Sequence, residues 1–251
     1  MQIPDDIEFE INIYSAAPPG ASTGTSAAVS VALIGALDRL TPGRLTAHEA
    51  ASLAHHVETT KLGLQSGIQD QLCSAYGGIN YIEMHKFPHA SVSPILIANP
   101  VWWELENRLL LVYIGTPHSS SDVHKKVIKE LGNDGPRDRR LEELRRLACR
   151  AKDALSTGEF NSLGEIMNQN TAIQKELHKD LVCERFVELM KIGREFNAIG
   201  FKVNGAGGDG GSMTILNNGQ NYLKRSLAEE LKKRGFSIID MYLSRVGLRV
   251  W

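Results

Sequence analysis

Hydrophobic residues follow a strand spacing at the beginning of the chain and a helical spacing soon afterwards. Apolar and polar residues alternate over Ile7–Ile13, which predicts a half-buried strand. From Thr25 to Leu40 charge is almost absent before Asp38, which predicts a deeply buried helix. Thr46 followed by Glu49 has the spacing of a capping box and opens a predicted helix that runs to about Lys61. One short helix and three strands are predicted next: Ile68–Tyr76, Ile79–Met84, around Val92–Ile97, and Arg108–Ile114.

Charged residues become denser after Ser119, and we place a domain boundary near residue 105. The predicted domains are therefore 1–105 and 106–251. Amphipathic spacing predicts helices over Asp122–Leu131, Arg137–Ser156, Phe160–Gln169, Leu181–Phe196 and Asn221–Arg234. Strands are predicted at Gly200–Val203, Ser212–Leu216, Ser237–Leu243 and Gly247–Trp251.

A run of small residues joins the first predicted strand to the first predicted helix: Pro18, Pro19, Gly20, Ala21, Ser22, Thr23, Gly24, Thr25, Ser26, Ala27 and Ala28. Glycine permits positive φ, and the free N–H groups and dipole of a helix start attract anions. The run lacks the lysine of a Walker-type loop and does not fit G-x-G-x-x-G. We expect the phosphates of a nucleoside triphosphate here; a tight turn capped by hydroxyls explains the run equally well.

Two acids follow in positions that suit phosphoryl transfer. Asp70 stands at the start of the short helix, just after Gly67, and Glu58 stands at the end of the preceding helix. This chemistry needs Mg²⁺ on the phosphate oxygens and an acid that orients or deprotonates the attacking hydroxyl. Ser26 and Glu58 are candidate Mg²⁺ ligands, and Asp70 is the candidate acid. The alternatives are a helix N-terminal acid for Asp70 and a solvated surface charge for Glu58.

A second glycine-rich run, Asn204–Gly211, follows the strand predicted at Gly200–Val203. Such glycine density costs backbone entropy, so packing alone explains it poorly. We expect this loop to approach a phosphate or a sugar closely. The alternative is a mobile connection that binds no ligand.

Composition narrows the class of protein. The 251 residues are 42% hydrophobic and 23% charged with a formal net charge of -1, which favours a soluble globular protein without a polyanionic partner. The three cysteines are odd in number and far apart, which fits a reducing, cytoplasmic location. We predict no membrane span, because no apolar run reaches the length needed to cross a membrane. We also predict no nucleic-acid partner, since acids interleave with the arginines of residues 137–150. The oligomeric state stays open.

The three chemistry-bearing segments, in this order, resemble the GHMP kinase superfamily. Pro19–Ala28 resembles the phosphate loop of that family, and Gly205–Gly208 resembles its C-terminal glycine motif. The run Gly67–Gln71, followed by Tyr76–Asn80, is most similar to the branch of D-glycero-D-manno-heptose 7-phosphate kinases and fucokinases. The resemblance extends in register from about Ile7 to the C-terminus.

The resemblance implies an α+β fold of two domains, the first similar to ribosomal protein S5 domain 2 and the second ferredoxin-like. It implies an ATP-dependent kinase that phosphorylates a hydroxyl of a sugar or sugar phosphate, with ATP and Mg²⁺. By this resemblance Asp70 is the catalytic acid, and Ser26 and Glu58 bind the metal. The ATP-binding residues would be Pro19, Gly20, Ala21, Ser22, Thr23, Gly24, Thr25 and Ser26. The second loop, near substrate or phosphate, would comprise Gly205, Ala206, Gly207 and Gly208.

Three departures from the family pattern change the expectation. Ser22 replaces a glycine of the phosphate loop, and Asp209 interrupts the second glycine run. The strands and the Arg- and Asp-bearing motif that precede the phosphate loop in the family have no counterpart here, so the first domain is expected to be truncated. We therefore predict reduced or absent turnover. The alternatives are a catalytically impaired fragment or partner subunit that binds nucleotide, and a decarboxylase built on the same loop.

Overall fold

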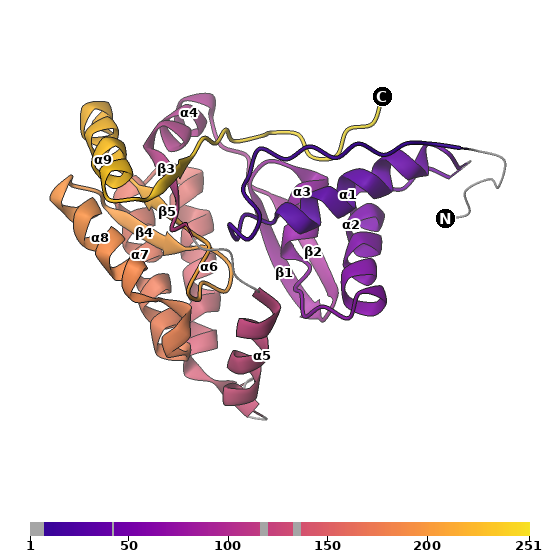
Figure 1. Ribbon diagram of the computed structural model, residues 1–251, viewed down its shortest axis with the longest axis horizontal. Helices are drawn as coiled ribbons and strands as arrows, with labels where there is room; N and C mark the ends of the chain where they lie inside the picture. Colours follow the sequence, from indigo (N-terminus) through magenta and orange to yellow (C-terminus); the bar gives the residue numbers. More distant parts are fainter. Residues whose placement is uncertain (1–7, 42, 116–119, 133–136) are drawn as a thin grey trace. The chain divides into compact units, whose positions relative to one another are not determined.

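The computed structural model describes residues 8–41, 43–115, 120–132 and 137–251 (Figure 1). The chain packs as two units, each with its own hydrophobic core. The first unit contains residues 8–18, 24–95 and 243–251, and the second contains residues 19–23 and 96–242. The predicted domain limits of 1–105 and 106–251 stay a prediction.

Among the described residues of the first unit, three α-helices pack with a hairpin. Its helices are α1 (Thr25–Asp38), α2 (Ala47–His56) and α3 (Gln69–Tyr76), and α2 continues into the π-helical turn η1 (Val57–Lys61). The capping box at α2 is confirmed, because Thr46 N donates to Glu49 Oε2 at 2.8 Å and Glu49 N donates to Thr46 Oγ1 at 3.3 Å. The helices meet through small and branched residues, which let the backbones approach closely: Val31, Ile34, Ala50, Ala51, Ala54, Ile68, Leu72 and Ala75.

The hairpin of this unit consists of β1 (Asn80–Lys86) and β2 (His89–Pro94). The two strands are antiparallel, from the pair Asn80↔Pro94 to the pair Lys86↔His89. The strand predicted at Ile79–Met84 is thereby confirmed. The strand predicted around Val92–Ile97 begins earlier and ends at Pro94.

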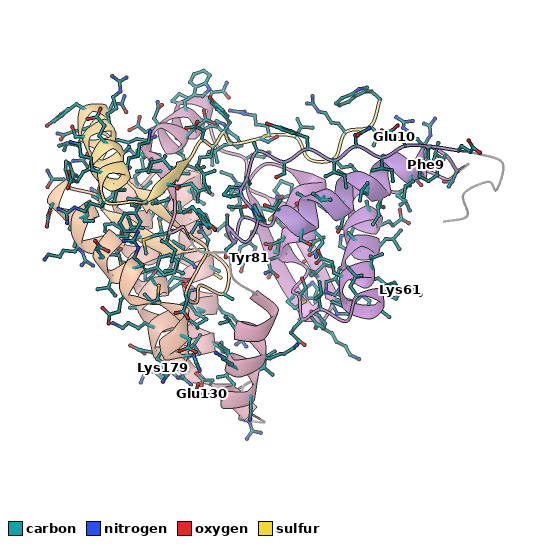
Figure 2. All side chains as sticks on the ribbon, viewed as in Figure 1. Phe9, Glu10, Lys61, Tyr81, Glu130 and Lys179 are labelled. Carbon is teal, nitrogen blue, oxygen red and sulfur yellow. The ribbon has the colours of Figure 1, made fainter. Side chains whose placement is uncertain are left out.

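The strand predicted at Ile7–Ile13 is wrong over the residues that the structure describes; Ile7 lies outside them. Residues 8–14 run as an irregular segment beside α1, on which Figure 2 labels Phe9 and Glu10. The side chains of Phe9 and Ile13 are 49% and 59% exposed. An alternating pattern specifies which side chains share a face, but a strand also needs a partner for its backbone, and no described strand pairs with this segment.

Helix α1 is less buried than predicted. Its buried residues are Ala27, Val31, Ile34 and Gly35, whereas Ala32 and Ala36 are exposed. The apolar residues of its other face line a groove of about 450 Å³ together with residues 9–14. The apolar residues all round this helix predicted burial on every side, but on this side the helix borders an open groove.

Two further elements differ from the sequence prediction. The strand predicted at Gly247–Trp251 is wrong: this segment is an irregular strap held to α3, where Leu248 N donates to Ala75 O at 3.1 Å. Helix α4 (Asn99–Arg108) was not predicted; Pro100 lies in its first turn, a position that suits proline, and its Trp102 is buried.

The second unit is built on an antiparallel sheet. Its strands are β3 (Leu109–Tyr113), β4 (Gly200–Val203), β5 (Ser212–Leu216) and β6 (Ser237–Ile239), in the order β4-β5-β3-β6. Helices lie around this sheet (Figure 1): α5 (Ser120–Leu131), α6 (Arg139–Thr157), α7 (Phe160–Leu177), η3 (Lys179–Leu181), α8 (Glu184–Glu195) and α9 (Asn221–Lys233). This order of strands and helices is that of a ferredoxin-like sheet, with extra helices between β3 and β4, as predicted. The core includes Val112, Phe186, Leu189, Phe201, Met213, Ile215, Leu227 and Leu231.

Candidate active site

The predicted phosphate loop leads into helix α1 with an unusual backbone. Gly20, Ser22 and Gly24 have φ of 73°, 55° and 68°. Gly24 is the N-cap of α1 and supplies no side-chain hydrogen bond to the first turn. No N-cap side chain therefore occupies the first N–H groups of α1. These groups and the positive end of the helix dipole can attract an anion. Ser22 adopts the left-handed conformation that the family pattern reserves for glycine.

Glu58 is the centre of a hydrogen-bonded group in the first unit, which we call the Glu58 cluster: Ser26, Glu58, Ser66 and Gln71. Ser26 Oγ donates to Glu58 Oε1 at 2.6 Å. Gln71 Nε2 and Ser66 Oγ donate to Glu58 Oε2 at 2.6 Å and 3.2 Å. Glu58 is only 4% exposed, so the alternative of a solvated surface charge is wrong. Burying a carboxylate is costly unless donors surround it, and this cluster supplies them.

Local backbone geometry places Glu58 in this cluster. The residue lies in the π-helical turn η1, where Leu62 N bonds to Val57 O at 3.0 Å. The wider turn points the side chains within it in other directions than a continuous α-helix would, and π-turns are frequent at functional sites. His55, one turn earlier, lies with Nε2 3.2 Å from Ser66 O and so helps to hold the segment that carries Ser66.

Asp70 lies against the phosphate loop within the same unit. A Cβ built on Gly24 would lie 3.3 Å from the Asp70 Cγ and 3.4 Å from its Oδ2. Asp70 itself is exposed at the first turn of α3. The structure therefore brings Asp70 to Gly24 and Glu58 to Ser26 at the start of α1, and the assignment of these residues to one reaction centre stays a prediction.

The second glycine-rich loop contacts the other half of the phosphate loop, in the second unit. Ser212 Oγ donates to Ala21 O, and a Cβ on Gly205 would lie 3.3 Å from Ser22 Cβ. Gly207 has φ of 60°, and a Cβ there would lie 1.9 Å from Leu181 O. Glycine is thus required at Gly207 by both conformation and space. Ala206, Gly207 and Gly208 are buried, whereas Asp209 is exposed.

A lysine stands beside this loop. Lys202 Nζ donates to Gln174 Oε1 at 2.9 Å and to Val203 O. Burial lowers the pKa of Lys202 from its ordinary value of 10.5 to about 8, because a charged ammonium is poorly solvated there.

Sequence reasoning assigned no role to Ser66, Gln71, Lys202 or Ser212. Ser66 and Gln71 stand in the same stretch as Asp70, so their proximity in sequence was a usable signal. Gln71 is fully buried, and its Oε1 has no hydrogen-bond partner among the described residues. Lys202 and Ser212 flank the glycine-rich run, but only the packing shows which groups they reach.

Comparison with known proteins indicates the family of the chain. The family model described as GHMP kinases N terminal domain matches residues 2–78. The mevalonate kinase of Pyrococcus horikoshii is 32% identical over 251 residues, an alignment that covers 97% of this chain and 69% of that protein. The chain belongs to the GHMP kinase family.

Two further relatives are sugar-phosphate kinases by name. The D-glycero-alpha-D-manno-heptose 7-phosphate kinase of Campylobacter jejuni is 24% identical over 245 residues, covering 98% of this chain and 71% of that protein. The crystal structure of a D-glycero-D-manno-heptose 1-phosphate kinase from Bacteroides thetaiotaomicron matches with a TM-score of 0.69 at 21% identity, over 94% of this chain and 66% of that one. The chain spans about two thirds of the length of these relatives, and the second likeness shows the fold.

The comparisons confirm the predicted resemblance, the α+β GHMP kinase fold and the class of enzyme, a phosphotransferase. They also support a small-molecule acceptor. No helix in the described ranges has both the length and the apolar character to cross a bilayer.

Proposed function

We propose that this GHMP kinase transfers the γ-phosphoryl group of ATP to a hydroxyl of a sugar or sugar phosphate. One observation carries the proposal: the buried Glu58 bonds to Ser26 in the first turn of α1, and Asp70 lies against Gly24 at the start of that same helix. The buried Glu58 and the exposed Asp70 thus both lie next to residues of the phosphate loop. Phosphoryl transfer uses acids in two roles, one toward a metal and one toward the acceptor.

In this proposal residues Pro19–Ser26 bind the triphosphate through backbone N–H groups. The three positive φ angles of the loop turn successive peptide groups in directions that an ordinary helix entry does not reach. The dipole of α1 adds a favourable potential for negative charge. Gly205, Ala206, Gly207 and Gly208 are proposed to contact phosphate or substrate.

The donor set fits Mg²⁺. Ser26 Oγ and Glu58 Oε1 are hard oxygen atoms 2.6 Å apart, and the Gln71 Oε1 nearby is a buried acceptor without a partner among the described residues. In the part of the chain that the structure describes, no group of three or more His, Cys, Asp or Glu residues gathers as a metal cage. This agrees with Mg²⁺, which proteins often hold through one or two carboxylates together with phosphates and water. Bound there, Mg²⁺ would neutralise developing phosphate charge.

Asp70 is proposed to act on the acceptor. Its carboxylate is exposed at the loop, where it can accept a hydrogen bond from the attacking hydroxyl and orient or deprotonate it. Ser26 and Glu58 act on the donor side. The two acids thus divide the reaction between acceptor and donor.

The test is release of ADP by the purified chain with ATP, Mg²⁺ and a panel of heptose phosphates, hexoses and mevalonate. We expect measurable but reduced turnover with a sugar or sugar phosphate, and we expect Asp70→Asn to lower kcat by about 10²-fold or more because the acceptor hydroxyl loses the carboxylate that orients or deprotonates it. Product mass must increase by one phosphoryl group. Turnover that Asp70→Asn leaves unchanged would contradict the assignment of Asp70.

A second candidate is a nucleotide-binding subunit without turnover. The observation that favours it is the exposed apolar segment with Phe9, Ile11 and Ile13, which flanks the groove on α1. A large exposed apolar patch is typical of an incomplete or partner-binding surface. Calorimetric titration with ATP separates the candidates: binding without acceptor-dependent ADP release supports the second.

We place the protein in the cytoplasm within this proposal. Cys73, Cys149 and Cys183 form no disulfide with one another, which is compatible with a reducing compartment.

A further inference from the structure

The glycine-rich loop begins where an edge strand ends. In the four-stranded sheet β4 is terminal and pairs with β5 on one side. The outer side of an edge strand presents backbone N–H and C=O groups that need partners. Whatever binds the outer side of β4 therefore also fixes the direction in which Asn204 and Gly205 leave the sheet.

Helix α7 provides these partners with side chains. Asn168 Nδ2 donates to Ile199 O at 2.9 Å, while Asn168 Oδ1 accepts from Phe201 N at 3.0 Å. One turn later Thr171 Oγ1 donates to Phe201 O at 2.8 Å and accepts from Val203 N at 3.3 Å. The two side chains thus satisfy alternate groups of β4, as a neighbouring strand would.

The close approach of α7 to β4 has a steric basis. A Cβ built on Gly200 would lie 2.7 Å from the Gly164 Cα, so two glycines face each other where helix and strand cross. In Figure 1 α7 lies next to β4, and the two elements pack directly. This contact brings short polar side chains of the helix within hydrogen-bond distance of the strand backbone.

Gln174 continues the same row toward the loop. Asn168, Thr171 and Gln174 are spaced by three and share one side of the helix. Gln174 Nε2 donates to Gly205 O at 3.2 Å, and Gln174 Oε1 accepts from Lys202 Nζ at 2.9 Å. A lysine only donates and a carbonyl only accepts, which fixes the orientation of the amide.

Gly205 in turn contacts the phosphate loop. A Cβ built on Gly205 would lie 3.3 Å from Ser22 Cβ, and the Ser212 hydroxyl at the other end of the glycine-rich run donates to Ala21 O. A displacement of Gly205 would therefore be transmitted to residues 21 and 22. Misplacement by about 1 Å can lower a rate by about 10²-fold.

We propose that Gln174 is a positioning residue of the kinase: its amide holds the Gly205 carbonyl and thereby sets the position of the glycine-rich loop against the phosphate loop. The role in catalysis rests on the proposed function, whereas the role in ordering the loop does not. In this proposal Gln174 acts through the Gly205 carbonyl and not on the substrate itself.

The test compares Gln174→Met with Gln169→Met, a matched substitution at an exposed position of the same helix. Amide hydrogen exchange of residues 204–211 should rise about fivefold in Gln174→Met, which corresponds to one lost hydrogen bond of about 1 kcal/mol. Exchange in β4 and α7 should stay as in the parent chain, and Gln169→Met should leave the loop unchanged. The kcat of Gln174→Met should fall about tenfold while the Tm changes little.

Gln174→Glu sharpens the result, since a carboxylate still accepts from Lys202 but does not donate to Gly205 O. We expect it to resemble Gln174→Met in loop exchange and to fold normally. Wild-type exchange in either variant, or a rise spread equally over β4 and the loop, would overturn the proposal. If the parent chain shows no kinase activity, the proposed function fails while the exchange comparison still decides the role of Gln174.

Discussion

The Glu58 cluster and the glycine-rich loop are both held in place, but by opposite means. In the Glu58 cluster, side chains of Ser26, Ser66 and Gln71 surround one buried carboxylate. In the glycine-rich loop, side chains are nearly absent, and backbone groups are held by α7 or packed against neighbouring backbone. One region depends on a charge and its donors, whereas the other depends on the lack of a Cβ.

This difference predicts different sensitivities. A change of charge without a change of size should harm the Glu58 cluster most. An added methyl group should harm the glycine-rich loop most, because its backbone has neither the space nor the φ that other residues prefer. Substitutions in each region can distinguish the dependence on charge from the dependence on backbone space.

The largest effect on stability is expected from Gly207→Ala. The added Cβ would meet Leu181 O at 1.9 Å in addition to the strain of a positive φ. We expect the free energy of unfolding to fall by about 3 kcal/mol or more, from strain and displacement of η3. Urea denaturation followed by circular dichroism measures it.

Gly63→Ala is the matched control for Gly207→Ala. Gly63 has φ of +66°, but a Cβ built there would meet no heavy atom within 4 Å among the described residues beyond its chain neighbours. The substitution should cost about 1 kcal/mol, the conformational part alone. Equal losses in the two variants would show that close backbone packing does not hold the glycine-rich loop.

A smaller, pH-dependent effect is expected from Lys202→Met. Burial lowers the pKa of Lys202 to about 8 in the folded chain, from 10.5. Between these pH values the unfolded chain binds more protons, so the stability of the parent chain should rise with pH. From pH 8 to pH 10 we expect a gain of about 2 kcal/mol from this group, and Lys202→Met should lose it.

Lys233→Met in α9 is the control for this pH dependence, because Lys233 is exposed. Its stability should rise between pH 8 and pH 10 as much as that of the parent chain. If Lys202→Met gains as much stability with pH as the parent chain does, then Lys202 is not the buried base beside the loop.

The sequence predicted helices and caps better than it predicted which segments pair as β-strands. Spacing and caps act within a few residues, so the sequence could predict most helices, including the capping box at Thr46 and the start of α1 at Thr25. Residues 8–13 and Gly247–Trp251 are not strands in the described chain, because a strand requires a distant partner that an alternating pattern does not identify. No pattern in the neighbouring sequence predicted the π-turn at Glu58 or the row of α7 side chains that binds the backbone of β4.

The candidate residues came from the resemblance more than from spacing. Spacing alone favoured a surface charge at Glu58, whereas the structure buries this residue. The roles proposed for Asp70, Ser26 and the two loops stay predictions. Gln71 and Gln174 were beyond sequence reasoning, because glutamine in a helix is common and only its hydrogen-bond partners distinguish it.

The most direct test of the account is the dependence of ATP binding on Mg²⁺, measured by calorimetry on the parent chain, Glu58→Gln and the exposed control Glu165→Gln. We predict that Mg²⁺ strengthens ATP binding about tenfold or more in the parent and the control, but only weakly in Glu58→Gln, because the metal loses a charged oxygen ligand. Without Mg²⁺, Glu58→Gln should bind ATP at least as tightly as the parent, since a repulsive charge is gone. An equal effect of Mg²⁺ on all three proteins would contradict the claim that Glu58 and Ser26 hold the metal of a kinase.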